Sequence, residues 1–131
     1  MHPLLCSALE RVGLAQPTPS IVTKIIFPTV DMAASIGFYE RLGFGVESYD
    51  EGYAWVKHDG RELFHLAHVA DLDVDANRAA GYFHVRDVDE VNTRWSRETE
   101  AVSALADQPW GMREFAIKDP SNNLLRVGQN L

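Results

Sequence analysis

Apolar residues recur along the chain at two different spacings, and their order predicts the elements of the fold. Residues 21–30 are rich in β-branched and aromatic side chains, which favours a strand, and Pro28 within them favours an edge or a strand end. From Asp31 onward the spacing is helical, so we predict a helix that is capped by Asp31 and ends at Gly43 in the left-handed conformation. The buried stripe of this helix consists of Met32, Ile36, Tyr39 and Leu42.

Three short strands are predicted after this helix. Apolar and polar residues alternate over residues 44–49, 53–57 and 63–68, as they do in half-buried strands. The segments between these strands, DEG at 50–52 and DG at 59–60, have the composition of tight turns. The first half of the chain is therefore predicted to be a strand, a helix and three strands.

The same order returns in the second half of the chain. Residues 81–86 are predicted as a strand, and Asp87 followed by Glu90 is typical of a helix start. Further strands are predicted at 101–105, 114–118 and 124–127, the last two joined by a turn over 119–123. Two β-α-β-β-β modules, at about residues 21–70 and 80–131, predict an α+β fold in which a curved mixed sheet carries its helices outside.

Residues 1–20 precede the repeat and are predicted to be an extension or linker, either a short amphipathic helix or a frayed tail. Cys6 is the only cysteine, so no intrachain disulfide is expected. No apolar run reaches the roughly 18–20 residues of a membrane span. Glu10 and Arg11 interrupt any secretory signal, and we therefore expect a cytoplasmic protein that makes no membrane contact.

Composition and charge narrow the classes of function. A chain of 131 residues with 46% hydrophobic and 24% charged residues is expected to form one ordinary globular domain. Its formal net charge of −7 disfavours nucleic acid as a partner, because phosphate backbones bind basic surfaces. The acidity serves either solubility alone or the attraction of a cationic ligand.

Two stretches of sequence carry a resemblance to a known family. FYERLGF at 38–44, after a strand and an aspartate, resembles the first helix of the vicinal oxygen chelate superfamily. That superfamily includes glyoxalase I, extradiol dioxygenases, fosfomycin resistance enzymes and bleomycin resistance proteins. QPWGMREFA at 108–116, followed by DP at 119–120, resembles its bleomycin-binding members. The resemblance runs from about Ile21 to the C-terminus and implies the same paired-module fold.

The resemblance also implies metal positions that this chain does not fill. Enzymes of the superfamily hold a divalent ion with side chains that donate a lone pair. The corresponding positions here are Lys24, His65, Ala80 and Arg126. Because three of these four side chains have no lone pair to donate, we expect neither a metal site nor a cofactor. A strand register shifted by one residue would instead enlist His68 or His84 and favour a metal-dependent enzyme.

Alternation along the strands predicts which side chains share the face of a ligand groove. Tyr53 and Trp55 share one face of their strand, and so do Tyr82 and His84. The resemblance places Tyr53, Tyr82 and Trp110 where bleomycin-binding relatives carry aromatic residues that stack on the drug. A core position is the alternative for Trp55, and simple solvation is the alternative for Glu47. The candidate ligand-binding residues are Glu47, Tyr53, Trp55, His65, Tyr82, His84, Trp110, Gly111 and Met112.

The resemblance implies a function as well as a fold. Relatives form homodimers by exchanging the N-terminal strand at a proline hinge, which corresponds to Pro28 here, and bind drug at the interface. We therefore expect stoichiometric, non-catalytic binding of bleomycin-type glycopeptides, with any metal arriving on the drug. The alternatives are a metal-dependent enzyme of the same superfamily and a binder of another aromatic or cationic metabolite.

Overall fold

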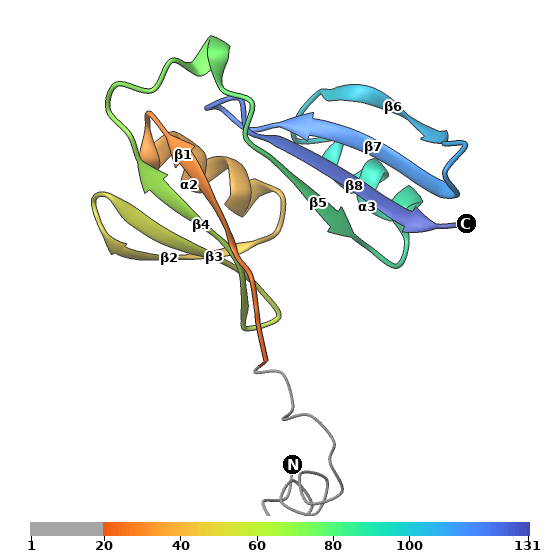
Figure 1. Cartoon of the computed structure of the whole chain (residues 1–131), viewed down its shortest axis with the longest axis horizontal. Coiled ribbons are helices and arrows are strands. Elements are labelled where there is room, and N and C mark those ends of the chain that lie inside the picture. Colours follow the sequence, from red (N-terminus) through yellow and green to blue (C-terminus); the bar gives the residue numbers. More distant parts are fainter. Residues whose placement is uncertain (1–19) are drawn as a thin grey trace, which may run out of the picture.

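The first four-stranded sheet carries one helix and comes from the first half of the chain (Figure 1). A computed structural model describes residues 20–131. The elements are β1 (Ile25–Thr29), α2 (Met32–Arg41), β2 (Gly45–Asp50), β3 (Tyr53–His58) and β4 (Arg61–His68). Their order in the sheet is β1-β4-β3-β2, with β1 parallel to β4 and the other neighbours antiparallel. Pro28 therefore lies in an edge strand, where its missing amide hydrogen costs no internal ladder bond.

The second sheet repeats this topology. A 3-10 turn, η1 (Val74–Ala76), leads into β5 (Ala80–His84), α3 (Val88–Trp95), β6 (Ala101–Asp107), β7 (Met112–Lys118) and β8 (Leu124–Asn130). The strand order is β5-β8-β7-β6, and β5 runs parallel to β8. The predicted α+β architecture with two β-α-β-β-β units is thus confirmed.

The caps and turns that join these elements match their sequence signals. Asp31 Oδ1 accepts a hydrogen bond from the Ala34 amide, and Asp87 Oδ1 accepts one from the Glu90 amide, so both helices begin where predicted. Gly43 follows α2 with a φ of 103°, which few residues other than glycine adopt. Asn122 has a φ of 70° in the turn between β7 and β8.

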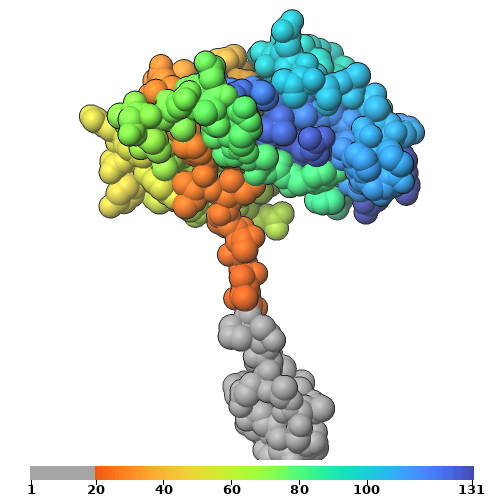
Figure 2. Space-filling view, turned by 45° about the horizontal axis from the view of Figure 1, so that its top comes forward, coloured from red at the N-terminus to blue at the C-terminus, as the bar shows by residue number. Residues whose placement is uncertain are grey.

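The first strand is shorter than predicted. β1 begins at Ile25, whereas the strand was predicted from residue 21. Ile21 and Val22 are 77% and 76% exposed, and the start of the described chain projects from the body of the molecule (Figure 2). High β-propensity does not by itself supply a neighbouring strand, so these residues lie beyond the sheet. The predicted extension over 1–20 lies outside the described residues except for Ser20.

One apolar core joins the two halves. Its members come from both sheets and both helices, and they include Phe64 and Phe83, whose rings lie 5.6 Å apart. Trp95 is buried, as predicted, and its indole nitrogen donates to the Leu42 carbonyl at 3.0 Å. Since burial alternates along the strands, each sheet has one core face and one open face. The side chains on the open faces are therefore the ones available to contact a ligand.

A buried polar cluster connects α2 to the turn between β7 and β8. The Asp119 carboxylate, 5% exposed, accepts hydrogen bonds from the Tyr39 hydroxyl, from the Ser121 amide, and from the backbone and side chain of Asn123. Ser121 in turn donates to Thr29 of β1. The two halves are therefore held together by hydrogen bonds as well as by apolar contact. No helix among residues 20–131 is long and apolar enough to cross a membrane.

Candidate functional site

The open face of the first sheet carries aromatic and charged side chains from β2, β3 and β4. We call it the Tyr53 face and define it as Glu47, Tyr53, Trp55, Lys57, Glu62 and His65. The rings of Tyr53 and His65 lie 5.3 Å apart, and those of Trp55 and His65 lie 6.4 Å apart. Trp55 is half-buried on this face rather than part of the core, so the strand alternation was correct.

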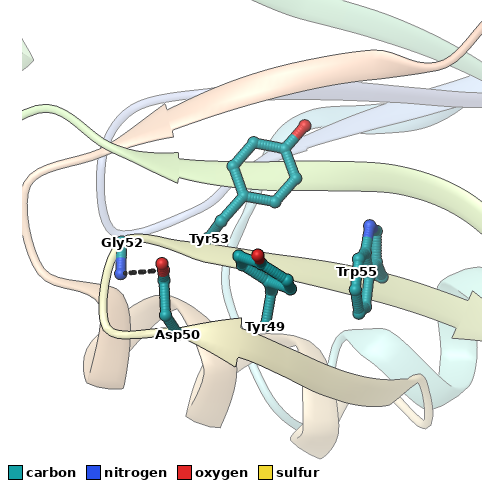
Figure 3. Close-up of a pocket in the computed structure, with 5 residues that line it drawn as sticks. All are labelled: Tyr49, Asp50, Gly52, Tyr53 and Trp55. Carbon is teal, nitrogen blue, oxygen red and sulfur yellow. Dashed lines mark hydrogen bonds between the residues drawn. The ribbon is translucent and has the colours of Figure 1, made fainter.

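A cavity of about 530 Å³ opens beside Tyr53. Figure 3 shows its lining residues on the β2–β3 hairpin, with the rings of Tyr49 and Trp55 standing over the strands and the Asp50 carboxylate bonded to the Gly52 amide. The rings of Tyr49 and Trp55 lie 5.8 Å apart. Tyr49 was not among the predicted site residues, although alternation from Glu47 would have placed it on this face. Rings beside a carboxylate suit a flat cationic ligand.

Ion pairs and hydrogen bonds order the charged groups of the Tyr53 face. Lys57 Nζ donates to Glu47 Oε1 at 2.5 Å, so the predicted ligand-binding carboxylate already has a partner. His65 bridges two groups, with Nε2 2.7 Å from Glu62 Oε1 and Nδ1 2.7 Å from the Tyr53 hydroxyl. The hydrogen bond from His65 and the charges of Lys24 and Lys57 lower the pKa of Glu62, although burial opposes them.

On the open face of the second sheet, several side chains surround one buried carboxylate, that of Glu114. We call it the Tyr82 face and define it as Tyr82, His84, Trp110, Met112, Glu114 and Arg126. Glu114 is 1% exposed and accepts a hydrogen bond from the Tyr82 hydroxyl at 2.5 Å. Burial, together with the hydrogen bond to Glu114 and its charge, raises the pKa of Tyr82 to about 12, so this phenol stays protonated. Arg126 Nη1 lies 3.5 Å from Glu114 Oε1 and balances the charge.

The turn before β7 presents the predicted Trp110, Gly111 and Met112. Trp110 is 64% exposed, and its indole nitrogen points to Glu114 Oε2 at 3.5 Å. Gly111 has a φ of 85°, which permits the turn, and the Gln108 amide closes it by donating to the Met112 carbonyl at 2.7 Å. An exposed indole at the rim of a sheet face is suited to stacking on a flat ligand.

The predicted groove residues fall into two separate sets, one on the Tyr53 face and one on the Tyr82 face. Tyr53, Trp55 and His65 contact one another, and Tyr82 and His84 lie with their rings 4.8 Å apart. Over residues 20–131 we find no hydrogen bond or ring contact between the Tyr53 face and the Tyr82 face. Sequence reasoning treated these side chains as one groove, whereas in this single chain they lie on the open faces of two different sheets.

The side chains at the four positions where the resemblance implies metal ligands do not suit a divalent ion. Lys24 donates to the Glu62 carbonyl at 2.6 Å, and Arg126 pairs with Glu114. Both ring nitrogens of His65 are engaged by neighbours. Within residues 20–131, no group of three or more His, Cys, Asp or Glu side chains is arranged to hold a metal. Two cations and one occupied imidazole do not provide the lone pairs that a metal site requires.

Similarity to known proteins agrees with this geometry. The chain is 30% identical over 123 residues to a bleomycin resistance protein of Klebsiella pneumoniae, a match that covers 88% of this chain and 92% of the relative. A bleomycin resistance determinant encoded on the transposon Tn5 has 27% identity and a TM-score of 0.75, with 85% of this chain and 98% of that chain covered. A bleomycin-binding protein complexed with bleomycin has 27% identity and a TM-score of 0.73, with 86% and 100% covered.

A family model covers most of the chain as well. It matches residues 21–127, which include the first sheet, both helices, the second sheet up to the middle of β8, and all the side chains of the two open faces. The chain therefore belongs to the Glyoxalase/Bleomycin resistance protein/Dioxygenase superfamily.

Proposed function

We propose that this protein binds bleomycin-type glycopeptide antibiotics stoichiometrically and without catalysis, and confers resistance by sequestering the drug in the cytoplasm. The observation that carries the proposal is the 64% exposed indole of Trp110 beside Tyr82, in a chain similar to proteins named for bleomycin resistance and binding. Exposed aromatic rings that lie together on one surface, rather than scattered singly, commonly indicate a ligand or partner site. A flat heteroaromatic system is the ligand that such rings accommodate best.

Charge supports a cationic ligand. The whole chain has a net charge of −7, and Asp50 lies in the cavity lined by Tyr49, Tyr53 and Trp55. A positively charged tail over these rings gains cation–π attraction of about 0.5–2 kcal/mol per contact. The metal belongs to the drug in this proposal, because the side chains at the family's metal positions are cationic or already engaged.

A second copy of the chain would complete the site. β1 pairs with β4 of its own chain, and exchange would replace this pairing by the identical one from a partner. The arm ahead of β1 supports such an exchange, because its residues Ile21 and Val22 are 77% and 76% exposed and continue into Ile26 of β1, which is 55% exposed. We propose a homodimer in which the Tyr53 face of one protomer meets the Tyr82 face of the other.

The proposal predicts a simple binding stoichiometry. When purified protein is titrated with copper(II)-loaded bleomycin, tryptophan fluorescence and heat release should saturate at one drug per chain. The drug should be recovered chemically unchanged, and metal analysis of protein prepared without chelator should find no stoichiometric metal. Absence of binding at tens of micromolar drug would contradict the proposal. Stoichiometric nickel, zinc, manganese or iron in the purified protein would favour a metal-dependent enzyme instead.

The dimer makes a separate prediction. Replacing both Ile21 and Val22 by aspartate removes the apolar arm and places like charges at the interface, so the dimer should dissociate. Light scattering after size-exclusion chromatography should show the mass of one chain for this variant and of two for the wild type. The Val102→Asp variant, changed at a 51% exposed residue of β6, should stay dimeric. A dimer that survives both arm substitutions would contradict the role of the arm.

A further inference from the structure

The hydroxyl proton of Tyr82 is directed into the protein. Glu114 is buried and accepts the Tyr82 hydroxyl at 2.5 Å. Tyr82 is itself 39% exposed, so a ligand on this face can reach its side chain. A phenol that donates inward can only accept a hydrogen bond from a ligand. Tyr82 therefore offers an acceptor to whatever lies on this face.

The hydroxyl of Tyr53 also donates its proton inward, in this case to His65. Glu62 is held ionised, since its pKa is lowered, and an ionised carboxylate only accepts hydrogen bonds. The 2.7 Å contact with Glu62 Oε1 thus assigns the proton of neutral His65 to Nε2. Nδ1 is then bare and accepts the Tyr53 hydroxyl at 2.7 Å. Tyr53, like Tyr82, turns its proton inward.

Two further features keep the Tyr82 arrangement in place. Gly128 lies under the Tyr82 hydroxyl, where a Cβ atom would overlap the phenol oxygen and crowd the Glu114 side chain. The indole nitrogen of Trp110 also faces Glu114, at 3.5 Å. The Glu114 carboxylate thus accepts from two donors, the Tyr82 O–H group and the Trp110 N–H group. The Tyr82 face then presents ring faces and oxygen lone pairs, but not these two donors, to a ligand.

We propose that Glu62 and Glu114 are positioning residues that turn the two tyrosine hydroxyls inward, and that the open faces consequently select ligands that present N–H donors. The inference rests on the proposed function only in that the same two faces bind the ligand. It adds a rule of specificity, because ligands that offer only acceptors meet lone pairs and lose a hydrogen bond at each tyrosine. Neither carboxylate need touch the ligand.

Indole and benzofuran provide a matched pair of neutral probes. The two bicyclic rings have nearly the same size and shape, but indole presents an N–H where benzofuran has an oxygen, and neither responds to the net charge of the protein. We expect indole to bind about fivefold more tightly at pH 7.5, as one net hydrogen bond implies. The shifts of the Tyr53 and Tyr82 ring signals in NMR spectra report each face separately.

Variants separate positioning from mere structural support. Glu114→Leu, which removes the acceptor of the phenol proton, and Tyr82→Phe, which keeps the ring but has no hydroxyl, should each bring the ratio of indole to benzofuran affinity at the Tyr82 face close to one. Glu62→Leu should do so at the Tyr53 face, and Glu40→Leu, changed on the exposed side of α2, should alter neither ratio. A purely structural role would weaken both probes equally and leave the ratio intact.

The outcomes are distinct from those of the drug titration. Equal affinity of the wild type for both probes, no binding of either, or an unchanged ratio in Tyr82→Phe and Glu62→Leu would each overturn the inference. The ring nitrogens of His65 provide a measurement without any probe, since ¹⁵N shifts should show Nε2 protonated and Nδ1 bare at pH 7.5. The opposite tautomer would also overturn it. Failure to bind copper(II)-bleomycin would remove the proposed function and leave this rule standing.

Discussion

Replacing Asp119 by alanine is expected to destabilise the protein by about 3 kcal/mol, because several buried donors lose their acceptor at once. The Tyr39 hydroxyl, fully buried, and the amides of Ser121 and Asn123 all donate to this carboxylate at 2.7–3.0 Å. The alanine side chain accepts nothing, and the site is too enclosed for each donor to regain water. Thermal unfolding should show a midpoint roughly 10–15 °C lower than that of the wild type.

The control for this change is Tyr39→Phe. It removes one of the donors and leaves the carboxylate with its backbone partners, so we expect a loss of only about 1 kcal/mol. If Asp119→Ala unfolded at the same temperature as Tyr39→Phe, the cluster would contribute no more than a single hydrogen bond. In that case the apolar core alone would hold the two halves together.

The pH dependence of stability provides a second control. Burial raises the pKa of Asp119, although hydrogen bonds from Asn123, Tyr39 and Ser121 oppose the shift. A raised pKa in the folded state gives stability that is fully present below the unfolded pKa of about 3.9 and is lost as pH rises through the folded pKa. Asp119→Asn does not titrate, so the stability advantage of the wild type over it should shrink as pH rises through that window.

Local sequence signals predicted most of the fold. Asp31 and Asp87 cap their helices as expected. An aspartate directly before an apolar stripe of helical spacing is a strong signal for the first residue of a helix. Strand alternation placed Tyr53 and Trp55 on one face and Tyr82 and His84 on another, since the period of a strand is two. The extent of β1 was wrong, because strand ends depend on whether a neighbouring strand is present.

The long-range contacts lay beyond sequence reasoning. The hydrogen bond between Tyr39 and Asp119 joins residues 80 positions apart, and no local pattern specifies that pairing. Glu114 is the clearest omission from the predicted site, because a glutamate in a strand is normally expected to face solvent. Only several residues taken together would have indicated that Glu114 is buried. Gly128 leaves room for its side chain, and Tyr82 donates a hydrogen bond to it. The division of the groove into two faces likewise depends on tertiary packing.

Replacing Trp110 by alanine is expected to weaken the binding of copper(II)-bleomycin about thirtyfold. Loss of an aromatic side chain that stacks on the ligand costs about 2 kcal/mol, which corresponds to that ratio of dissociation constants. The indole is 64% exposed and belongs to the turn before β7, so its removal leaves the core intact. Isothermal titration calorimetry on the wild type and the variant measures the difference directly.

The specificity of this effect depends on two comparisons. Trp110→Phe keeps a flat ring and should retain most of the affinity, because stacking requires a π face more than it requires an N–H group. The midpoint of thermal unfolding of Trp110→Ala should stay close to that of the wild type, since exposed substitutions usually change stability by less than about 0.5 kcal/mol. Undiminished affinity in Trp110→Ala would remove this indole from the drug site. Equal losses in the alanine and phenylalanine variants would show that binding requires the indole N–H group rather than a flat ring face alone.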